Sequence, residues 1–408
     1  MDYIHFVGIG GISMSALAEI MRTRGKKVSG SDISINGHAT ENIPPDADTV
    51  VINGAISDDN PELVAARERG LRIVRREELL ALVAREYRNV IAVAGAHGKS
   101  TTTAMIASIF IAAGLNPTVH NGARALSEDT TPQTLSDDAL PPQALGGPGN
   151  LVIGGDEFFI TEACEFRRSF LALHPMVSVI TNIDTDHMDC YRDLDDVIAT
   201  YQQFADQSNV VVTNEPIKHP KVLEYTKVDF PLGIPGEHNR ENAGAAAAVA
   251  RHFGIGEDII RHALASFDGI SRRFELLGGI DGADIITDYA HHPREIAATL
   301  KMIDGLYPRT LIVYQPHTYS RTKHLFTDFT DVFHDVDVVF YKTYSARENP
   351  IAGGRAEDIA MATGKDCLLS ERHLRNYICC AACEYDAIIF MGAGDIDDIA
   401  RRIVNQPM

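Results

Sequence analysis

The fold can be inferred from one segment of the chain, residues 89–102, whose sequence is Asn-Val-Ile-Ala-Val-Ala-Gly-Ala-His-Gly-Lys-Ser-Thr-Thr. Its apolar, partly β-branched start predicts a buried strand, and the apolar positions that follow Thr102 recur at helical spacing. A strand, a glycine-containing turn and a helix in this order are typical of a phosphate-binding loop in a parallel α/β domain. The segment therefore predicts a parallel α/β fold with a nucleoside triphosphate site.

The residues of this turn supply the chemistry of such a site. Glycine lets backbone N–H groups close around phosphate oxygens, and the helix N-terminus adds a positive dipole end. Lys99 would neutralise phosphate charge, and the Ser100 hydroxyl could bind Mg²⁺. The pattern GxxxxGK[ST] has a glycine where this chain has Val93, so an ordinary turn without a ligand is the competing interpretation. We assign to nucleotide binding Gly95, His97, Gly98, Lys99, Ser100 and Thr101.

Strand-like runs alternate with amphipathic helical stretches along the chain, and the alternation starts three times, at Tyr3, at Asn89 and near Asp284. At about 100 to 200 residues per domain, 408 residues have room for two or three domains. We predict three α/β domains with boundaries near residues 88 and 270. They are a Rossmann-like domain (1–88), a central domain with a P-loop ATPase-like parallel sheet (89–270) and a C-terminal Rossmann-like domain (271–408).

The composition excludes several classes of protein. A formal charge of -19, from 37 basic and 56 acidic residues, opposes non-specific attraction to nucleic acid or an anionic membrane. The start of the chain does not resemble a secretory signal, and six irregularly spaced cysteines favour reduced thiols in the cytoplasm over a disulfide framework. Cys380 and Cys383 form a CxxC pair, but no second pair has zinc spacing, so small buried side chains are the favoured interpretation. Residues 127–150, rich in Pro, Gly, Asp and Thr, predict a mobile surface loop.

Polar clusters follow six expected strands, at residues 94–100, 161–165, 181–187, 287–292, 315–318 and 391–395. Ligands of open parallel sheets bind at the carboxyl ends of strands, so we expect these clusters to border one large cleft. Mg²⁺ takes hard oxygen ligands and, less often, imidazole, which makes Ser100, Glu165 and His187 the candidate metal ligands. A carboxylate at a helix N-terminus and a structural histidine are the competing interpretations of Glu165 and His187.

A second glycine-rich turn follows the first strand. Residues 8–15, Gly-Ile-Gly-Gly-Ile-Ser-Met-Ser, resemble a dinucleotide fingerprint in which Ser13 replaces the third glycine, and Asp32 stands where a ribose-binding acid would lie. The pattern predicts a diphosphate resting on the helix, and a tight turn without a ligand is the alternative. The predicted substrate-binding residues of this domain are Gly10, Gly11, Ser13, Met14, Ser31 and Asp32.

Further candidates lie in the second half of the chain. Asn239 and Asn242, three apart on an expected helix, could contact an adenine edge, although a capped helix start would also explain them. Arg273 could bring a guanidinium to a phosphate, and Asp288 could accept hydrogen bonds from ribose hydroxyls. Solvated surface charges are the alternative for both. Cationic groups that could bind a carboxylate, with the same alternative, are His317, Arg321 and Lys323.

Taken together, these segments resemble the Mur ligases of peptidoglycan synthesis, and most closely their alanine-adding branch. The matching segments, in the order of the family, are residues 8–15, 95–102, 162–168, 181–187, 238–243, 272–275, 288–293, 317–322 and 391–395. The resemblance implies that the first domain holds a UDP-sugar, the central domain binds ATP and Mg²⁺, and the third admits the amino acid. Several relatives carry a carbamylated lysine on the metal, and residues 199–206 contain no lysine, as in the alanine-adding branch.

By position, the resemblance makes Lys99 the phosphate lysine and places Ser100, Glu165 and His187 around the metal. Asn239 and Asn242 would contact adenine, and Arg273 and Asp288 would reach the nucleotide from the third domain. Ala96 and Ser100 stand where the family often has Thr, which keeps a hydroxyl after the lysine.

The implied reaction joins L-alanine to the lactyl carboxylate of UDP-N-acetylmuramate. A carboxylate is a poor electrophile, so we hypothesise that it attacks the γ-phosphate of ATP to form an acyl phosphate, with Lys99 and Mg²⁺ drawing charge from the phosphate. The amine then expels phosphate. Its proton needs a base, for which His291 and His292 are both candidates unless they only hold a turn. His292, His317 and Arg321 are also predicted to bind substrate.

Other functions stay open at this point. A small-molecule kinase would use the same loop and stop at phosphoryl transfer. A non-catalytic, nucleotide-binding Mur-like protein would keep the sites without turnover. A dehydrogenase is disfavoured by Ser13 and by the ATP-binding pattern. Within the family, the nearest alternative is the ligase that recycles a tripeptide onto the same nucleotide sugar.

Overall fold

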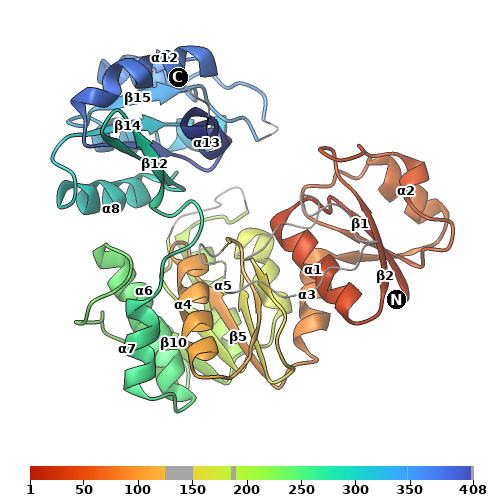
Figure 1. Cartoon of the computed structure of the whole chain (residues 1–408). Helices are drawn as coiled ribbons and strands as arrows, with labels where there is room; N and C mark the ends of the chain where they lie inside the picture. Colours follow the sequence, from red (N-terminus) through yellow and green to blue (C-terminus); the bar gives the residue numbers. More distant parts are fainter. Residues whose placement is uncertain (125–149, 185–189, 347, 406–408) are drawn as a thin grey trace. The chain divides into compact units, whose positions relative to one another are not determined.

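The structure is a computed structural model that describes residues 1–124, 150–184, 190–346 and 348–405 (Figure 1). Its internal contacts divide the chain into two compact units. The first comprises residues 1–234 and 238–269, and the second comprises residues 235–237 and 270–408. The first unit holds two β-sheets and the second holds one.

The N-terminal sheet has four strands in the order β2-β1-β3-β4, all parallel. Helix α1 covers it with an apolar face that includes Met14, Leu17 and Met21, which are buried. Asn60 caps α2 through the N–H groups of Glu62 and Leu63, and Pro61 opens the helix. The elements are β1 (Tyr3–Val7), α1 (Ile12–Thr23), β2 (Lys27–Ser31), η1 (Thr40–Asn42), β3 (Thr49–Ile52), α2 (Pro61–Glu68), β4 (Arg72–Arg75) and α3 (Arg76–Ala84).

The central sheet has seven strands in the order β11-β10-β9-β5-β8-β6-β7, with β7 antiparallel to β6 and the other pairs parallel. Strand β5 lies between β9 and β8, and five of its six residues are buried. The elements are β5 (Asn89–Ala94), α4 (Lys99–Ala112), β6 (Thr118–His120), β7 (Leu151–Val152), β8 (Phe158–Glu162), η4 (Phe166–Ala172), β9 (Val177–Ile180), α5 (Leu194–Asp206), β10 (Val210–Thr213), β11 (Val222–Leu223), α6 (Glu237–His252) and α7 (Glu257–Ala265).

The sheet of the second unit has six strands in the order β12-β13-β17-β14-β15-β16, with β12 antiparallel to β13 and the other pairs parallel. Helices pack on both faces, as Figure 1 shows. The elements are β12 (Glu275–Ile280), β13 (Ala283–Asp288), α8 (Pro293–Asp304), β14 (Thr310–Tyr314), α9 (Tyr319–His324), α10 (Phe326–Val332), β15 (Val338–Tyr341), α11 (Ala356–Thr363), β16 (Cys367–Leu368), α12 (Glu371–Ala381), η5 (Ala382–Glu384), β17 (Ala387–Met391) and α13 (Ile396–Asn405).

The predicted fold class, α/β with three mostly parallel sheets, is confirmed. Two expectations need correction. The third sheet starts before Asp284, where the alternation was expected to begin, because the glycine-containing stretch after Phe274 is itself a strand, β12, whose pairing with β13 shifts between Leu276 and Gly278. The six polar clusters lie at two sheet edges and not at one, because three follow strands of the central sheet and three follow strands of the sheet in the second unit. That they border one cleft stays a prediction. The domain boundaries near residues 88 and 270 stay a prediction.

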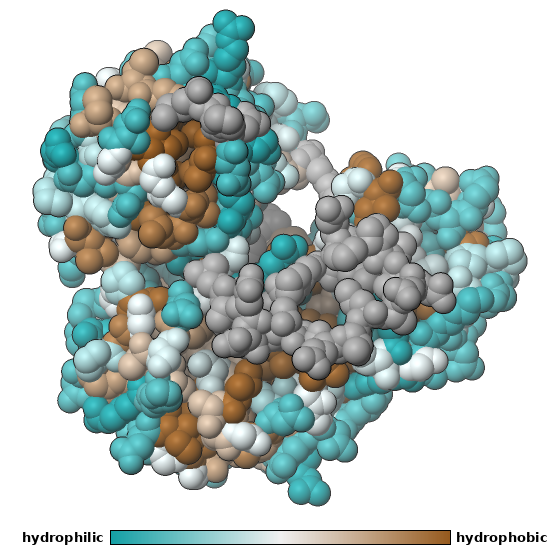
Figure 2. Space-filling model, in the orientation of Figure 1, coloured by the Kyte–Doolittle hydropathy of each residue, from teal (hydrophilic) through white to brown (hydrophobic). Residues whose placement is uncertain are grey.

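The surface agrees with the composition. Hydrophilic residues cover much of the face seen in Figure 2, with smaller hydrophobic patches among them. Within the described residues, no helix has the length and apolar character needed to cross a membrane. All six cysteines are free, and Cys380 and Cys383 are exposed, which contradicts their expected burial. The loop expected at residues 127–150 lies outside the described residues except for Asn150, which is buried and donates a hydrogen bond to the Ile12 carbonyl.

Candidate active site

The phosphate-binding loop predicted from the sequence connects β5 to α4 and depends on two glycines. Gly95 and Gly98 have φ values of 138° and 82°, in the left-handed region that favours glycine. A Cβ atom on Gly95 would collide with the Thr181 hydroxyl, and one on Gly98 would collide with the Asn242 side chain. The close approach of Asn242 to Gly98 places the start of α6 against the loop.

Residues that follow β9 hold this loop in place. The Asn182 side chain accepts from the His97 N–H at 2.8 Å and donates to the His97 carbonyl at 3.0 Å. The Thr181 hydroxyl donates to the same carbonyl at 2.6 Å. The His97 ring lies 3.4 Å from a carboxylate oxygen of Asp184. The roles of Thr181 and Asn182 were not predicted from the sequence. Thr101 is buried on the first turn of α4.

Lys99 forms an ion pair with Glu165, with 3.0 Å between Nζ and a carboxylate oxygen. Its ammonium also donates to the carbonyls of Gly95 and Ala96, at 2.5 and 3.1 Å. Burial alone would lower the pKa of Lys99, but the charge of Glu165 raises it above its usual value. Lys99 is therefore a cation at neutral pH, held in the loop before any phosphate arrives.

Ser100 faces a different carboxylate. Its hydroxyl donates to Glu162 at 2.6 Å, and Glu162 also accepts from the Gly122 N–H at 3.1 Å. A Cβ atom on Gly122 would collide with that carboxylate, so glycine is needed there. A hydroxyl and a carboxylate are hard oxygen donors of the kind that Mg²⁺ prefers, so this pair fits the metal that a triphosphate needs.

The metal role of Ser100, Glu165 and His187 stays a prediction. Glu165 pairs with Lys99, and Glu162, which the prediction left out, lies against Ser100. His187 lies outside the described residues. Within the described ranges, no group of three or more His, Cys, Asp and Glu side chains has the arrangement of a metal site.

The adenine candidates lie on one face of α6, as expected. Asn242 donates to the Asn239 side chain at 3.4 Å, and both residues are largely buried. The contact between Asn242 and Gly98 brings this pair to the phosphate loop.

The glycine turn of the N-terminal sheet is held by Asp32. Its carboxylate accepts from the Gly10 N–H at 3.2 Å and from the Ser34 N–H and hydroxyl at 3.0 and 2.7 Å. Burial works against the charge, but these hydrogen bonds outweigh it and lower the pKa of Asp32. Gly11 begins the helix as its N-cap. The Met14 side chain, by contrast, lies in the hydrophobic core, so only its backbone could reach a ligand.

Next to the end of β2 lies a buried carboxylate that was not predicted from the sequence. Glu62 is inaccessible to solvent and accepts hydrogen bonds from Ser31 at 2.6 Å and Asn42 at 3.2 Å. Ring nitrogens of His5 and His38 lie 2.8 and 2.9 Å from its oxygens. Burial alone would raise the pKa of Glu62, but these partners lower it to about 2. The Ser31 side chain is thus directed at Glu62, which fixes the end of β2 next to Asp32.

Ser13 joins the N-terminal sheet to the central sheet. Its hydroxyl lies 3.0 Å from Nε2 of His120, whose other ring nitrogen lies 3.0 Å from the Thr161 hydroxyl. Arg76 donates to the Ser13 hydroxyl at 3.4 Å. Burial, with the nearby charge of Arg76, lowers the pKa of His120 to about 4. His120 is therefore neutral at neutral pH. No sequence motif indicated it.

In the second unit, Asp288 anchors the segment that carries Arg273. The Asp288 carboxylate accepts from the N–H groups of Phe274 and Ala290, both at 2.9 Å, and from Thr299 at 3.3 Å. Burial raises the pKa of Asp288. Arg272 and Phe274, on either side of Arg273, have positive φ values of 64° and 51°. Asp288 thus stabilises an unusual backbone around Arg273, and its contact with ribose stays a prediction.

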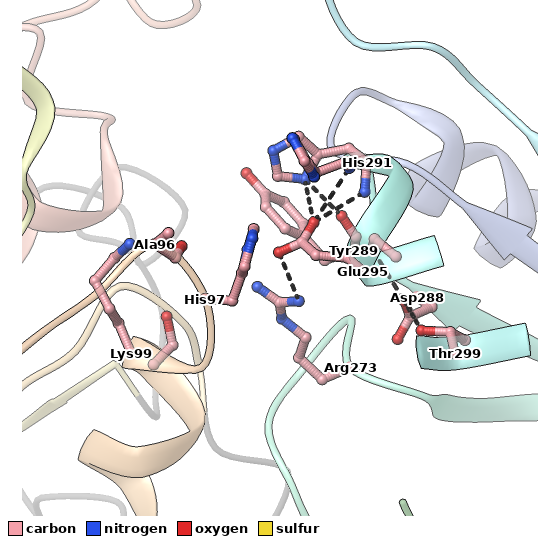
Figure 3. A network of polar contacts seen from close by, with 12 residues as sticks. Ala96, His97, Lys99, Arg273, Asp288, Tyr289, His291, Glu295 and Thr299 are labelled. Atoms are coloured by element: carbon pink, nitrogen blue, oxygen red, sulfur yellow. Dashed lines mark hydrogen bonds and ion pairs between the residues drawn. The ribbon is translucent and has the colours of Figure 1, made fainter. Parts of the chain in front are cut away.

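Glu295, which was not predicted from the sequence, connects Arg273 to His291 (Figure 3). One of its oxygens lies 3.8 Å from Arg273 Nη1, and the other lies 3.2 Å from Nδ1 of His291. His292 is the N-cap of α8, where its ring accepts from the Arg294 N–H at 3.4 Å. His317 lies near His291, with 5.8 Å between the ring centroids. Nδ1 of His317 is 3.3 Å from Nη1 of Arg321. His291, His317 and Arg321 therefore form one group at the carboxyl edge of this sheet.

Comparisons with known proteins agree with this geometry. Three family models match: "Mur ligase family, catalytic domain" over residues 3–88, "Mur ligase middle domain" over 93–227 and "Mur ligase, glutamate ligase domain" over 272–394. The UDP-N-acetylmuramate–L-alanine ligases of Lachnospira eligens and Chelativorans are 35% and 36% identical to the chain. These alignments cover 97% and 96% of this chain and 96% and 95% of those proteins.

Solved structures give the same picture. The UDP-N-acetylmuramate–alanine ligase of Thermotoga maritima has a TM-score of 0.80 at 26% identity, with 98% of each chain covered. The murein peptide ligase of Psychrobacter arcticus has a TM-score of 0.69 at 20% identity over the whole of both chains, a likeness of fold.

Proposed function

Because the chain belongs to the Mur ligase family, an ATP-dependent family that forms amide bonds, we propose that it joins L-alanine to the lactyl carboxylate of UDP-N-acetylmuramate. The products would be ADP, phosphate and the alanylated nucleotide sugar, a precursor of peptidoglycan. The chain would thereby serve cell-wall synthesis in the cytoplasm, and through it cell shape and division. The proposal of these two substrates rests on relatives that are about 35% identical over almost the whole chain.

The observation that supports catalysis is the paired arrangement at the phosphate loop. Lys99 pairs with Glu165, and the next residue, Ser100, pairs with Glu162. The loop therefore carries a cation at Lys99 and, beside it, two oxygen donors from Ser100 and Glu162. The N–H groups at the start of α4 would bind phosphate oxygens, and Lys99 would offset the charge that develops on the transferred phosphoryl group. Ser100 and Glu162, with His187 as a further candidate ligand, would hold Mg²⁺, which supplies additional positive charge at the phosphates.

The chemistry then follows in two steps. The lactyl carboxylate attacks the γ-phosphate, the bond to ADP breaks, and an acyl phosphate forms. The uncharged amine of alanine attacks the acyl carbon, and phosphate leaves. Asn239 and Asn242 would bind the adenine, and Arg273 would bind phosphate. His317 and Arg321 would bind a carboxylate.

His291 is the better of the two candidate bases. The ring of His292 is buried and caps α8, so proton transfer would compete with a structural hydrogen bond. The ring of His291 is close to Glu295, and a carboxylate at this distance would stabilise an imidazolium formed by proton transfer.

The test is phosphate release with ATP, Mg²⁺ and UDP-N-acetylmuramate, on addition of each amino acid in turn and of the tripeptide that the recycling ligase uses. We expect release to require L-alanine and to fall by about 100-fold or more in Lys99→Ala, the range typical of a lost transition-state contact. Lys365→Ala, in a residue of the second unit away from the candidate groups, is the control. Release of ADP without phosphate, and without any amino acid, would indicate a kinase. A requirement for the tripeptide would indicate the recycling ligase.

The acyl phosphate can be tested separately. UDP-N-acetylmuramate labelled with ¹⁸O in its carboxylate should transfer one ¹⁸O atom to the released phosphate. Release of unlabelled phosphate during amide formation would exclude this intermediate.

A further inference from the structure

A cavity of about 250 Å³ lies at the edge of the central sheet opposite the phosphate loop. It is bordered by the residues that precede β5, β9 and β10, whereas the phosphate loop follows β5. These three strands are parallel neighbours, so their amino ends meet at this edge. The six residues of β5 separate Arg88 from Gly95, which puts the cavity about 20 Å from the loop.

The polar groups of this cavity are mostly basic or hydrogen-bond donors. Arg85 and Arg88 follow α3, His174 lies shortly before β9, and Asn209 directly precedes β10. All four side chains border the cavity and belong to exposed residues. None of the described lining residues is acidic, and neither arginine forms an ion pair with any residue that the structure describes. Two unpaired guanidinium groups in one cavity repel each other, and a bound anion would remove that repulsion.

The rest of the lining is apolar. Ala84 and Val90 line one part, Ala172 and Met176 line another, and Tyr87 adds an aromatic ring that stacks on Phe159 with 4.9 Å between centroids. A volume of about 250 Å³ is several times the share of one water molecule in the liquid, so the cavity has room for a small organic molecule. Small-molecule sites are typically of this kind, with an apolar lining and a few convergent polar groups.

We propose that this cavity binds a small phosphate monoester with an apolar body, at a site distinct from the nucleotide site. A phosphate group suits the donors better than a carboxylate does, because its three oxygens and double charge can engage two guanidinium groups, an imidazole and an amide together. The apolar body packs against the side chains around Tyr87. Because the site lies at the start of β5, its occupant contacts the strand that carries the phosphate loop.

The experiment titrates the full chain with phenyl phosphate by isothermal calorimetry in the Lys99→Ala background, which weakens phosphate binding at the loop. We expect saturable binding at one site. The double variant Arg85→Gln/Arg88→Gln should lower the affinity by at least about tenfold, since each arginine contributes a charge-assisted contact. The control Arg72→Gln/Lys301→Gln removes two exposed charges outside the cavity and should leave the affinity unchanged.

Three results would overturn the proposal. They are the absence of saturable binding, an unchanged affinity in the Arg85→Gln/Arg88→Gln variant, and an equal loss in the control. Benzoate binding as tightly as phenyl phosphate would overturn the assignment to phosphate esters. Thermal unfolding of both double variants shows whether they are folded. Both arginines are exposed, so we expect the unfolding temperature to stay unchanged, and Arg85→Lys/Arg88→Lys should retain part of the affinity.

Discussion

His120 should make the stability of the chain depend on pH between about 6.5 and 4. Its ring is buried between Ser13 and Thr161, and burial together with the charge of Arg76 lowers its pKa from 6.5 to about 4. Between these two values, the unfolded state binds a proton that the folded state does not. The folded state is therefore favoured above pH 6.5 and loses stability as the pH falls toward 4.

The size of the effect follows from the two pKa values. Between pH 7.5 and pH 5, this one group should cost about 2 kcal/mol of the free energy of unfolding. In a unit of this size, each kcal/mol of lost stability lowers the melting temperature by about 2 to 4 °C, so a fall of about 4 to 8 °C is expected. The measurement is thermal unfolding at both pH values for the parent chain and for His120→Gln, which keeps a polar side chain but cannot gain a charge.

His120→Gln should lose less stability on acidification than the parent, by about 2 kcal/mol. His262→Gln, which replaces an exposed histidine of the same unit, is the matched control and should behave like the parent. If the parent and His120→Gln show the same loss between pH 7.5 and pH 5, the histidine is not held neutral in the folded state. The hydrogen bonds of His120 with Ser13 and Thr161 would then not require a neutral ring.

Three further predictions concern the loop and the network behind the first glycine turn. Gly98→Ala and Gly254→Ala both place alanine at a positive φ, which costs about 1 to 2 kcal/mol, but only at Gly98 does the new methyl group meet a side chain, that of Asn242. Both variants should therefore lower the melting temperature, whereas only Gly98→Ala should abolish phosphate release; equal activity of the two would contradict the steric argument. Ser100→Ala should lower turnover by about 100-fold or more, whereas Ser100→Thr should retain most of the activity. The measurement is phosphate release across a Mg²⁺ titration. An active Ser100→Ala variant would argue against a hydroxyl at the metal. Glu62→Gln should lower the free energy of unfolding by about 2 to 3 kcal/mol, as measured by urea unfolding at pH 7. The partners of Glu62 lower its pKa to about 2, so the parent should lose stability as the pH falls from 4.5 toward 2, and the variant should not show this loss. An unchanged acid profile in the variant would be evidence against the lowered pKa.

The elements around the glycine turns could be predicted from the sequence because local rules dominate there. The helix after Gly98 and the strand before Gly95 follow from apolar spacing and from the conformational freedom of glycine. Glu165 was expected near the phosphate loop because the strand before it was expected to lie in the same parallel sheet, and the parallel pairing of β5 with β8 agrees with this.

Other parts of the site were missed because they depend on contacts between distant segments. Glu62 lies on a helix far along the chain from its partner His5, and nothing in its local sequence distinguishes it from an exposed glutamate. The same holds for His120. The strand β12 was missed because its glycines lower the local preference for a strand, which its pairing with β13 outweighs.

The choice between the two carboxylates after β8 shows how the site balances its charge. Glu162 is the last residue of the strand and Glu165 follows three residues later, so a single turn directs one at Ser100 and the other at Lys99. Lys99 pairs with Glu165, and Glu162 pairs with the uncharged hydroxyl of Ser100, so these three ionisable groups together carry one excess negative charge. A triphosphate adds several more, and like charges at this range repel strongly in a partly buried site. Binding of the nucleotide therefore needs a further cation, and the Ser100–Glu162 pair is the part of the edge whose donors suit Mg²⁺.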